Sequence, residues 1–247
     1  VLKSSTALGA NNPFAFVGDV NGFFPNQVNN SAFVVVDGSG GDLSLGAENF
    51  ILNTLTANGA GIRNVAGNNS ITGGIFVPAG DHAVDVSTGS SFTSLLIDNT
   101  GVSNNAIITK LGGGQWNVSW LAMNTANIND GTIRITGAGT IGQGKVDNLN
   151  IAAGKTLDIG NSGMIVTTTS AATLKAQIVS GRNGGAWNGT GIRTSAAVTS
   201  GNKTGIGYND GASVVNPATG LADGQYQGET VAATDTVFAH VYLGDVN

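Results

Sequence analysis

Eight residues of the chain read Ile128-Asn129-Asp130-Gly131-Thr132-Ile133-Arg134-Ile135. An apolar residue leads into a turn that contains Gly131, and Ile133 and Ile135 then alternate with polar residues. Alternation with a period of two is typical of a strand with one buried face, and glycine supplies the positive φ angle that such a turn requires. The stretch therefore predicts a strand, a tight turn and a second strand.

Similar units recur along the chain. Glycines mark the turns at Gly38, Gly59, Gly80 and Gly101, each 21 residues apart, and again at Gly131 and Gly154. A unit this short cannot bury its own apolar face, so successive units must stack on one another to form a core. We therefore expect Val84, Ile133 and Leu157, which follow such glycines, to lie in one column.

Stacked units predict an all-β fold, a single-stranded parallel β-helix (β-solenoid) with a short helix and a mixed C-terminal cap. A β-sandwich, whose turns recur every 8–12 residues, is the alternative. We expect an N-terminal arm over residues 1–33, the solenoid over 34–169, and a helix with a β-rich capping module over 170–247.

Both ends of the chain depart from the repeat. A solenoid leaves an unpaired strand edge at each end, and such an edge can add a strand from another chain. The phenylalanine-rich arm could cover its own first coil or dock on another subunit, and the last strand, over residues 236–243, has large apolar groups on both faces. The side chains expected at subunit contacts are Phe14, Phe16, Phe23, Phe24, Phe238 and Tyr242.

The C-terminal region contains the clearest helix signal, over residues 170–181. Ser170 can serve as the N-cap, Leu174 and Ile178 fall on one face, and Gly181 can end the helix.

Three tryptophans are candidates either for the core or for sugar binding. Trp116 and Trp120 alternate around Val118 and so share a strand face, and Trp187 lies in a turn-rich segment. An inward face makes them core, whereas an outward face makes an aromatic strip on which glycan rings can stack.

Two pairs of opposite charges serve as markers of strand register. Arg134 and Asp158 each stand between apolar residues one repeat apart, so stacking makes them neighbours, as it does Arg63 and Asp85. We expect both pairs to be exposed and to contribute little stability.

The composition excludes several kinds of function. The chain of 247 residues has no Cys and carries 10 Lys and Arg against 15 Asp and Glu. Thiolate metal sites and disulfides are therefore impossible, and no basic patch is available for nucleic acid. No apolar run approaches the ~20 residues that span a bilayer, so membrane insertion is not expected. The start at Val1, without Met, is read as a processed and secreted product.

Catalysis has little support in the sequence. Asp42, Asp85 and Asp158 fall in non-adjacent repeats, whereas an acid–base pair must converge. Asp37 and Asp130 precede turn glycines and are expected to serve the turns. We expect a polar edge position for His82, a packed strand position for His240, and neither cofactor nor enzymatic activity.

Two stretches resemble known bacterial proteins. Ile108-Thr109-Lys110-Leu111-Gly112-Gly113-Gly114, together with residues 128–135, resembles the passenger-associated repeat of autotransporter-type proteins. Residues 181–192 with the closing 242–247 are similar to a C-terminal module of large surface proteins, after which a dockerin-like calcium segment or a PEP-CTERM sorting signal often follows. The resemblance implies export, a β-helix and a structural or adhesive role, without enzymatic residues.

Two fragments look like the start of a calcium loop. Gly18-Asp19-Val20-Asn21-Gly22 and Gly244-Asp245-Val246-Asn247 each lack the remaining ligands. A complete site takes 6–8 oxygens, so we expect neither fragment to bind calcium tightly.

These patterns favour a secreted, non-enzymatic structural protein of the bacterial cell surface. It would associate end to end with copies of itself into an extracellular filament, sheath or surface layer. An adhesin or carbohydrate-binding solenoid is one alternative, with a surface glycan as partner, and a polysaccharide-active enzyme is another.

Overall fold

The computed structural model describes residues 1–6, 14–18, 33–46, 49–53, 61–77, 79–97, 105–137, 144–210, 224–226 and 229–243. Within these ranges the protein is mostly β, with long parallel sheets. It also contains α1 (Ala171–Arg182), the 3-10 helix η1 (Asn183–Gly185) and α2 (Ser195–Thr199). The expected predominance of β-structure, the parallel sheets and the short helix are confirmed, whereas the all-β class is not.

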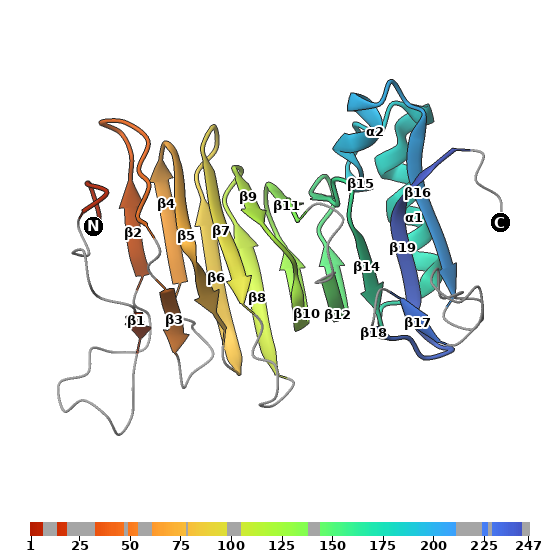
Figure 1. The fold of residues 1–247 in the computed structure, drawn as a ribbon, viewed down its shortest axis with the longest axis horizontal. Helices are drawn as coiled ribbons and strands as arrows, with labels where there is room; N and C mark the ends of the chain where they lie inside the picture. Colours follow the sequence, from red (N-terminus) through yellow and green to blue (C-terminus); the bar gives the residue numbers. More distant parts are fainter. Residues whose placement is uncertain are drawn as a thin grey trace.

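The chain alternates between two sheets, which we call sheet A and sheet B. Sheet B contains, in order, β1 (Phe14–Gly18), β3 (Asn49–Asn53), β5 (Asn68–Phe76), β7 (Ser91–Ile97), β9 (Gln115–Val118), β11 (Thr132–Ile135), β13 (Thr156–Asp158) and β15 (Gly191–Arg193). Sheet A contains, in order, β2 (Phe33–Asp37), β4 (Gly61–Ala66), β6 (Gly80–Val86), β8 (Ala106–Leu111), β10 (Ala122–Ile128), β12 (Gly144–Ile151), β14 (Gly163–Val166), β19 (Thr236–Tyr242) and β16 (Thr204–Asp210). All strand pairs up to β14 and β15 are parallel, and the strands succeed one another along the long axis (Figure 1). A separate hairpin pairs β17 (Gln225–Tyr226) with β18 (Glu229–Thr230).

The core lies between the two sheets and consists of columns of residues in register. One column of sheet A runs through Ile62, Val84, Lys110, Ile128 and Ile151. One column of sheet B runs through Phe92, Trp116, Ile133, Leu157 and Ile192, all fully buried. Successive side chains of a strand point to opposite faces, so the period-two pattern places every second residue in this core.

The expected single column of Val84, Ile133 and Leu157 is wrong. Val84 lies in sheet A, whereas Ile133 pairs with Leu157 in sheet B. Val84 comes before the turn of its unit and the other two come after theirs. Each unit therefore supplies one strand to each sheet, rather than two strands to one column.

The predicted glycine spacing is also partly wrong. The glycines that turn the chain from sheet A into sheet B are Gly67, Gly89, Gly112, Gly131 and Gly154, with φ angles between 64° and 83°. Gly131 and Gly154 were correctly identified, but Gly80 begins β6 and Gly38 does not have a positive φ. Gly59 and Gly101 lie outside the described residues. At Gly131 a Cβ atom would also collide with the carbonyl oxygens of Gly112 and Gly114, because successive turns are stacked closely.

The C-terminal part closes one end of this stack. Helix α1 packs beside β15, and β19 inserts antiparallel between β14 and β16 (Figure 1). The Oγ of Ser170 accepts a hydrogen bond from the N–H of Thr173, which confirms the predicted N-cap. Gly181 does not end α1: it lies inside the helix against the carbonyl of Ile192, and Asn183 ends the helix in the left-handed conformation.

The first residues of the chain lie along the outer edge of β2. The N–H of Leu2 donates to the carbonyl of Val35 at 2.7 Å, and the N–H of Asp37 donates to the carbonyl of Leu2 at 2.9 Å. Lys3 forms an ion pair with Asp37 at 3.2 Å. Residues 1–6 therefore cover part of the outer edge of β2.

The boundaries expected at residues 33 and 169 stay predictions. Strand β1, from the expected arm, pairs with β3, while β15 and β19 continue the two sheets beyond residue 169.

Candidate functional site

Two of the three candidate tryptophans are buried. Trp116 is fully buried in β9, and its Nε1 donates a hydrogen bond to Oγ of Ser94 at 2.9 Å. Trp187 is 3% exposed and belongs to the core beside α1. Neither ring can receive a sugar, so glycan stacking on Trp116 and Trp187 is wrong. Trp120 follows β9 and is half-buried, so its part in sugar binding stays a prediction.

The predicted subunit contacts divide in a similar way. Phe238 is fully buried between β14 and β16, so its side chain cannot contact another subunit. Tyr242, at the end of the same strand, is 70% exposed and stays a prediction. The side chains of Phe14 and Phe16, and all of Phe23 and Phe24, lie outside the described residues.

One of the two histidines, His82, does not lie where the sequence predicts it. His82 is not at a polar edge: it is 2% exposed in β6, because its position in the strand faces inward. His240 is half-buried in β19, and this burial lowers the pKa of its imidazole.

Several carboxylates serve turns, as expected. Asp37 accepts a hydrogen bond from the N–H of Ser39 at 3.0 Å, and Asp130 accepts one from the N–H of Gly131 at 2.8 Å. Among the described residues, no three histidines or carboxylates gather as a metal site. Both calcium-like fragments extend outside the described residues.

Lys110 is buried in the core, which the sequence did not indicate. Its Nζ donates to the carbonyl oxygens of Leu111 and Gly112 at 2.7 and 2.6 Å, and to that of Asp130 at 3.3 Å. The ammonium group thus ties the turn after β8 to the turn after β10. Burial lowers the pKa of Lys110 to about 8.

The two charge pairs behave differently. Arg63 and Asp85 are neighbours on β4 and β6 and form a partly exposed ion pair at 2.9 Å, as predicted. Arg134 and Asp158 are also neighbours in register, on β11 and β13. The expectation that both pairs are exposed is wrong for Asp158, which is 2% exposed.

Asp158 is the centre of a charged row that crosses three strands of sheet B. The row runs from Arg134 on β11 through Asp158 on β13 to Arg193 on β15. The Oδ1 atom of Asp158 accepts hydrogen bonds from the N–H groups of Gly160 at 3.0 Å and Ser195 at 2.9 Å. Its Oδ2 atom lies 3.7 Å from Nε of Arg193.

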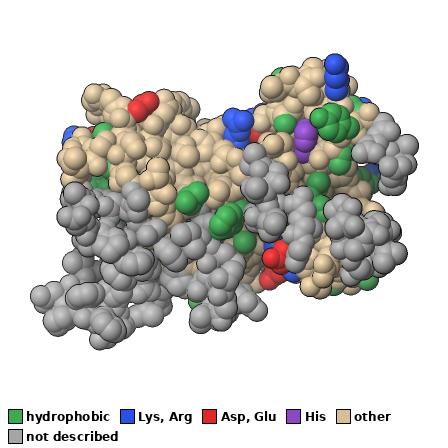
Figure 2. Space-filling view, in the orientation of Figure 1, with side chains coloured by type: hydrophobic (Ala, Val, Ile, Leu, Met, Phe, Trp, Pro, Cys, Tyr) green, Lys and Arg blue, Asp and Glu red, His purple; other side chains and the backbone are tan. Residues whose placement is uncertain are grey.

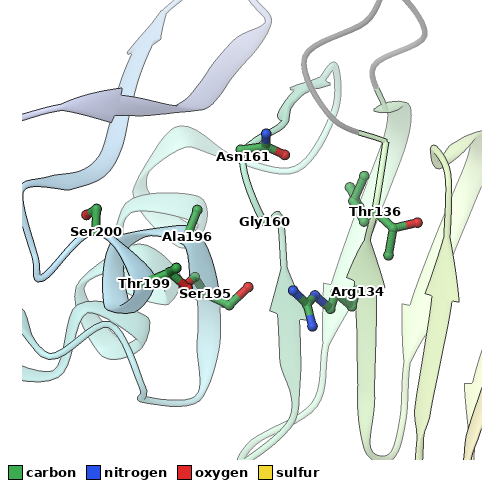
Figure 3. Close-up of a pocket in the computed structure, with 9 residues that line it drawn as sticks. Arg134, Thr136, Gly160, Asn161, Ser195, Ala196, Thr199 and Ser200 are labelled. Carbon is green, nitrogen blue, oxygen red and sulfur yellow. The ribbon is translucent and has the colours of Figure 1, made fainter.

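A pocket of about 380 Å³ opens beside this row, between the end of β11, the turn after β13 and α2 (Figure 3). Its lining consists of Arg134, Ile135, Thr136, Gly160, Asn161, Ser195, Ala196, Thr199 and Ser200. Figure 3 shows the guanidinium group of Arg134 and the side chain of Ser195 extending toward one another. The Nε of Arg134 and the Oγ of Ser195 are both buried without a hydrogen-bond partner.

The sequence predicted the residues on β11 and β13 beside this pocket, but not those contributed by β15 and α2. The alternation of β11 and β13 predicts that Arg134 and Asp158 are neighbours. Strand β15 is 35 residues after β13, with α1 between them, so no short repeat relates Arg193 or Ser195 to the row. An Arg on a third alternating segment, Gly191-Ile192-Arg193, was the available signal.

Comparisons of the chain with protein-family models, curated proteins and solved structures returned no match. Within the described residues, neither α-helix has the length and apolar character needed to cross a membrane.

Proposed function

We propose that the protein is a β-solenoid that serves as a non-enzymatic, exported structural rod of a bacterial cell surface and associates end to end with copies of itself. The observation that carries the proposal is the pair of parallel sheets fed by alternating strands from β1 to β15. A stack of this kind is quasi-one-dimensional, and it can be extended by adding a strand at either end.

The two ends of the stack differ, so contact between them joins copies head to tail. At one end lie β1 and β2, and at the other β16 is the outermost strand of sheet A (Figure 1). The sequence suggested β19 as the strand that contacts another subunit. Strand β19 is internal to sheet A, so we assign the contact to the edge strand β16 instead. Helix α1 covers β15, which leaves sheet A as the sheet to be continued. A heterologous contact that does not close forms a filament.

Export is supported by the resemblance around Ile108-Thr109-Lys110-Leu111-Gly112 to the passenger-associated repeat. In this chain the motif has a physical purpose, because Lys110 bonds the carbonyls of two stacked turns. Charged residues make up only 10% of the chain, and few of them are visible among the described residues on the face in Figure 2. A low content of charge suits a dense assembly on a cell surface.

Negative-stain electron microscopy of the purified full chain tests the association. We expect filaments whose length grows with protein concentration. A Tyr208→Asp variant should be monomeric, because Tyr208 is 43% exposed on β16 and a charge on an edge strand blocks strand addition. Leu95→Asp is the matched control: Leu95 is 42% exposed on β7, which has three strands of sheet B on one side and four on the other.

Circular dichroism should show that both variants remain folded. Single particles of the unmodified chain at every concentration, or filaments that persist in Tyr208→Asp, would contradict end-to-end association through β16.

A further inference from the structure

We infer that the pocket between β11, β13 and α2 binds a small hydroxylated carboxylate, of the class of sugar acids, with the carboxylate on Arg134. This inference does not rest on the proposed structural function. It rests on the charge balance of the row, on two unpaired buried polar atoms and on the lining of the pocket.

The charged row has an excess of one positive charge. Arg134 and Arg193 flank a single carboxylate, Asp158, on adjacent strands. One Asp158 oxygen already accepts two backbone N–H groups, and the other faces Arg193. The Nε–H of Arg193 also makes no hydrogen bond, but Arg193 keeps its ion pair with Asp158 and does not line the pocket. Arg134 lines the pocket and forms no ion pair within the described residues, so its charge is the one left for a ligand.

Arg134 is also the member that points into the pocket. Its Nε–H is buried and donates to no acceptor, which is an unfavourable state for a charged donor. A guanidinium group presents parallel N–H groups that match the two oxygens of a carboxylate. A carboxylate at this position would satisfy the donor and balance the excess charge.

The rest of the lining fits hydroxyl groups. Oγ of Ser195 is buried without a partner, and it lies opposite Arg134 in the pocket (Figure 3). Side chains of Thr136, Asn161 and Ser200 add further donors and acceptors around the cavity. At about 380 Å³ the pocket is near the lower limit for small-molecule sites, roughly 300–1,000 Å³, which suits a monosaccharide.

These side chains favour a carboxylate over a phosphate. Arg134 is the one cationic side chain among the residues that line the pocket in the described structure. A doubly charged phosphate usually receives several cationic or backbone donors, and α2, at five residues, is too short to add a helix-terminus site.

Isothermal titration calorimetry of the full chain with sodium glucuronate and sodium galacturonate tests the inference. Glucose and galactose serve as neutral partners of the same ring shape, and inorganic phosphate serves as a plain anion. We expect at least one uronate to bind at least tenfold more tightly than its neutral sugar and than phosphate. Absence of uronate binding, equal binding of the neutral sugar, or equal binding of phosphate would each overturn it.

Two variants assign the binding to the pocket. Arg134→Gln should weaken uronate binding at least tenfold, whereas Arg63→Gln, the same change on sheet A, should leave it unchanged. Ser195→Ala removes one unpaired hydroxyl and keeps the backbone bond to Asp158, so it should fold normally and weaken binding severalfold. Binding unaffected by both Arg134→Gln and Ser195→Ala would place the sugar acid elsewhere and refute the assignment.

Discussion

The repetitive stack from β2 to β13 and the C-terminal part from β14 onward build their cores by different means. In the stack, each unit repeats the same strand, turn and strand, and in-register columns fill the space between the sheets. In the C-terminal part, β14 pairs with β19, about 70 residues later, and α1 covers the end of sheet B. Repetition therefore builds the length of the molecule, and long-range contacts end it.

The two parts nevertheless share their sheets. Sheet A continues from β12 through β14 to β19, and sheet B continues from β13 to β15. The first set of variants below tests whether the two parts unfold together, and the other three sets measure individual interactions within them.

The largest effect is expected from removing a buried aromatic ring in each part. Trp116→Ala in the stack and Phe238→Ala in the C-terminal part should each lower the free energy of unfolding by about 3–5 kcal/mol. Both residues are fully buried, and Trp116 also loses its hydrogen bond to Ser94. Because the sheets are continuous, both changes should shift one common urea transition. Two separate transitions, each sensitive to one variant, would show that the parts fold independently.

Glycine turns provide the next contrast. Gly131→Ala should destabilise the protein by more than the ~1–2 kcal/mol cost of a left-handed residue. A Cβ there also meets the carbonyl oxygens of the turn stacked beneath it. Gly184, in the C-terminal part, has a φ of 68° but open space around it, so Gly184→Ala should cost only the backbone strain. Equal losses in urea denaturation would mean that the turns are not in close contact.

At alkaline pH, one buried group in each part should change the free energy of unfolding, and the two changes should have opposite signs. Burial lowers the pKa of Lys110 to about 8, so between pH 8 and its usual value of 10.5 the unfolded chain holds a proton that the folded chain has lost. Stability should therefore rise with pH there, by at most about 1.4 kcal/mol per pH unit.

The C-terminal part supplies the opposing group. Burial raises the pKa of Tyr226 from 10.0 to about 12, so above pH 10 the folded chain keeps a proton that the unfolded chain loses, and stability should fall. Urea denaturation from pH 7 to 11 measures both slopes. Lys110→Met should abolish the rise and Tyr226→Phe should weaken the fall, and a rise that persists in Lys110→Met would contradict the assignment.

The smallest effect is expected at the surface of the stack. A double-mutant cycle with Arg63→Ala and Asp85→Ala should give a coupling of about 0.2–1 kcal/mol, because the pair is partly exposed and screened by salt. A coupling above this range would mean that surface ion pairs contribute substantially to holding adjacent strands together.

The sequence predicts local features of the repetitive stack better than it predicts long-range contacts. The turn at Gly131, the strand through Ile133 and Ile135, and the Arg63–Asp85 pair depend on local alternation, so a short window contains the signal. The assignment of Val84 to the other sheet depends on which side of its turn it lies, and 39 glycines in the chain obscured the true turns.

Only part of the candidate site could be predicted from the sequence. The Arg134–Asp158 pair follows from the repeat, but the burial of Asp158 depends on α2, which reaches the row after an intervening helix. The burial of Phe238 likewise depends on β16, from a part of the chain without the repeat. Alternation in one strand does not show which distant segment will cover it.

Cross-linking tests the register of adjacent parallel strands most directly, because the chain has no native Cys. Thr93 and Asn117 are in-register neighbours on β7 and β9, and their side chains are hydrogen-bonded at 3.0 Å. Strands ~4.8 Å apart fall within the Cα separation of a disulfide, whereas strands two positions apart do not. The Thr93→Cys, Asn117→Cys variant should form an intramolecular disulfide on mild oxidation. The Thr93→Cys, Arg134→Cys variant should not, because Arg134 lies one strand further away, on β11. A disulfide in the second variant without one in the first would contradict the stacked arrangement.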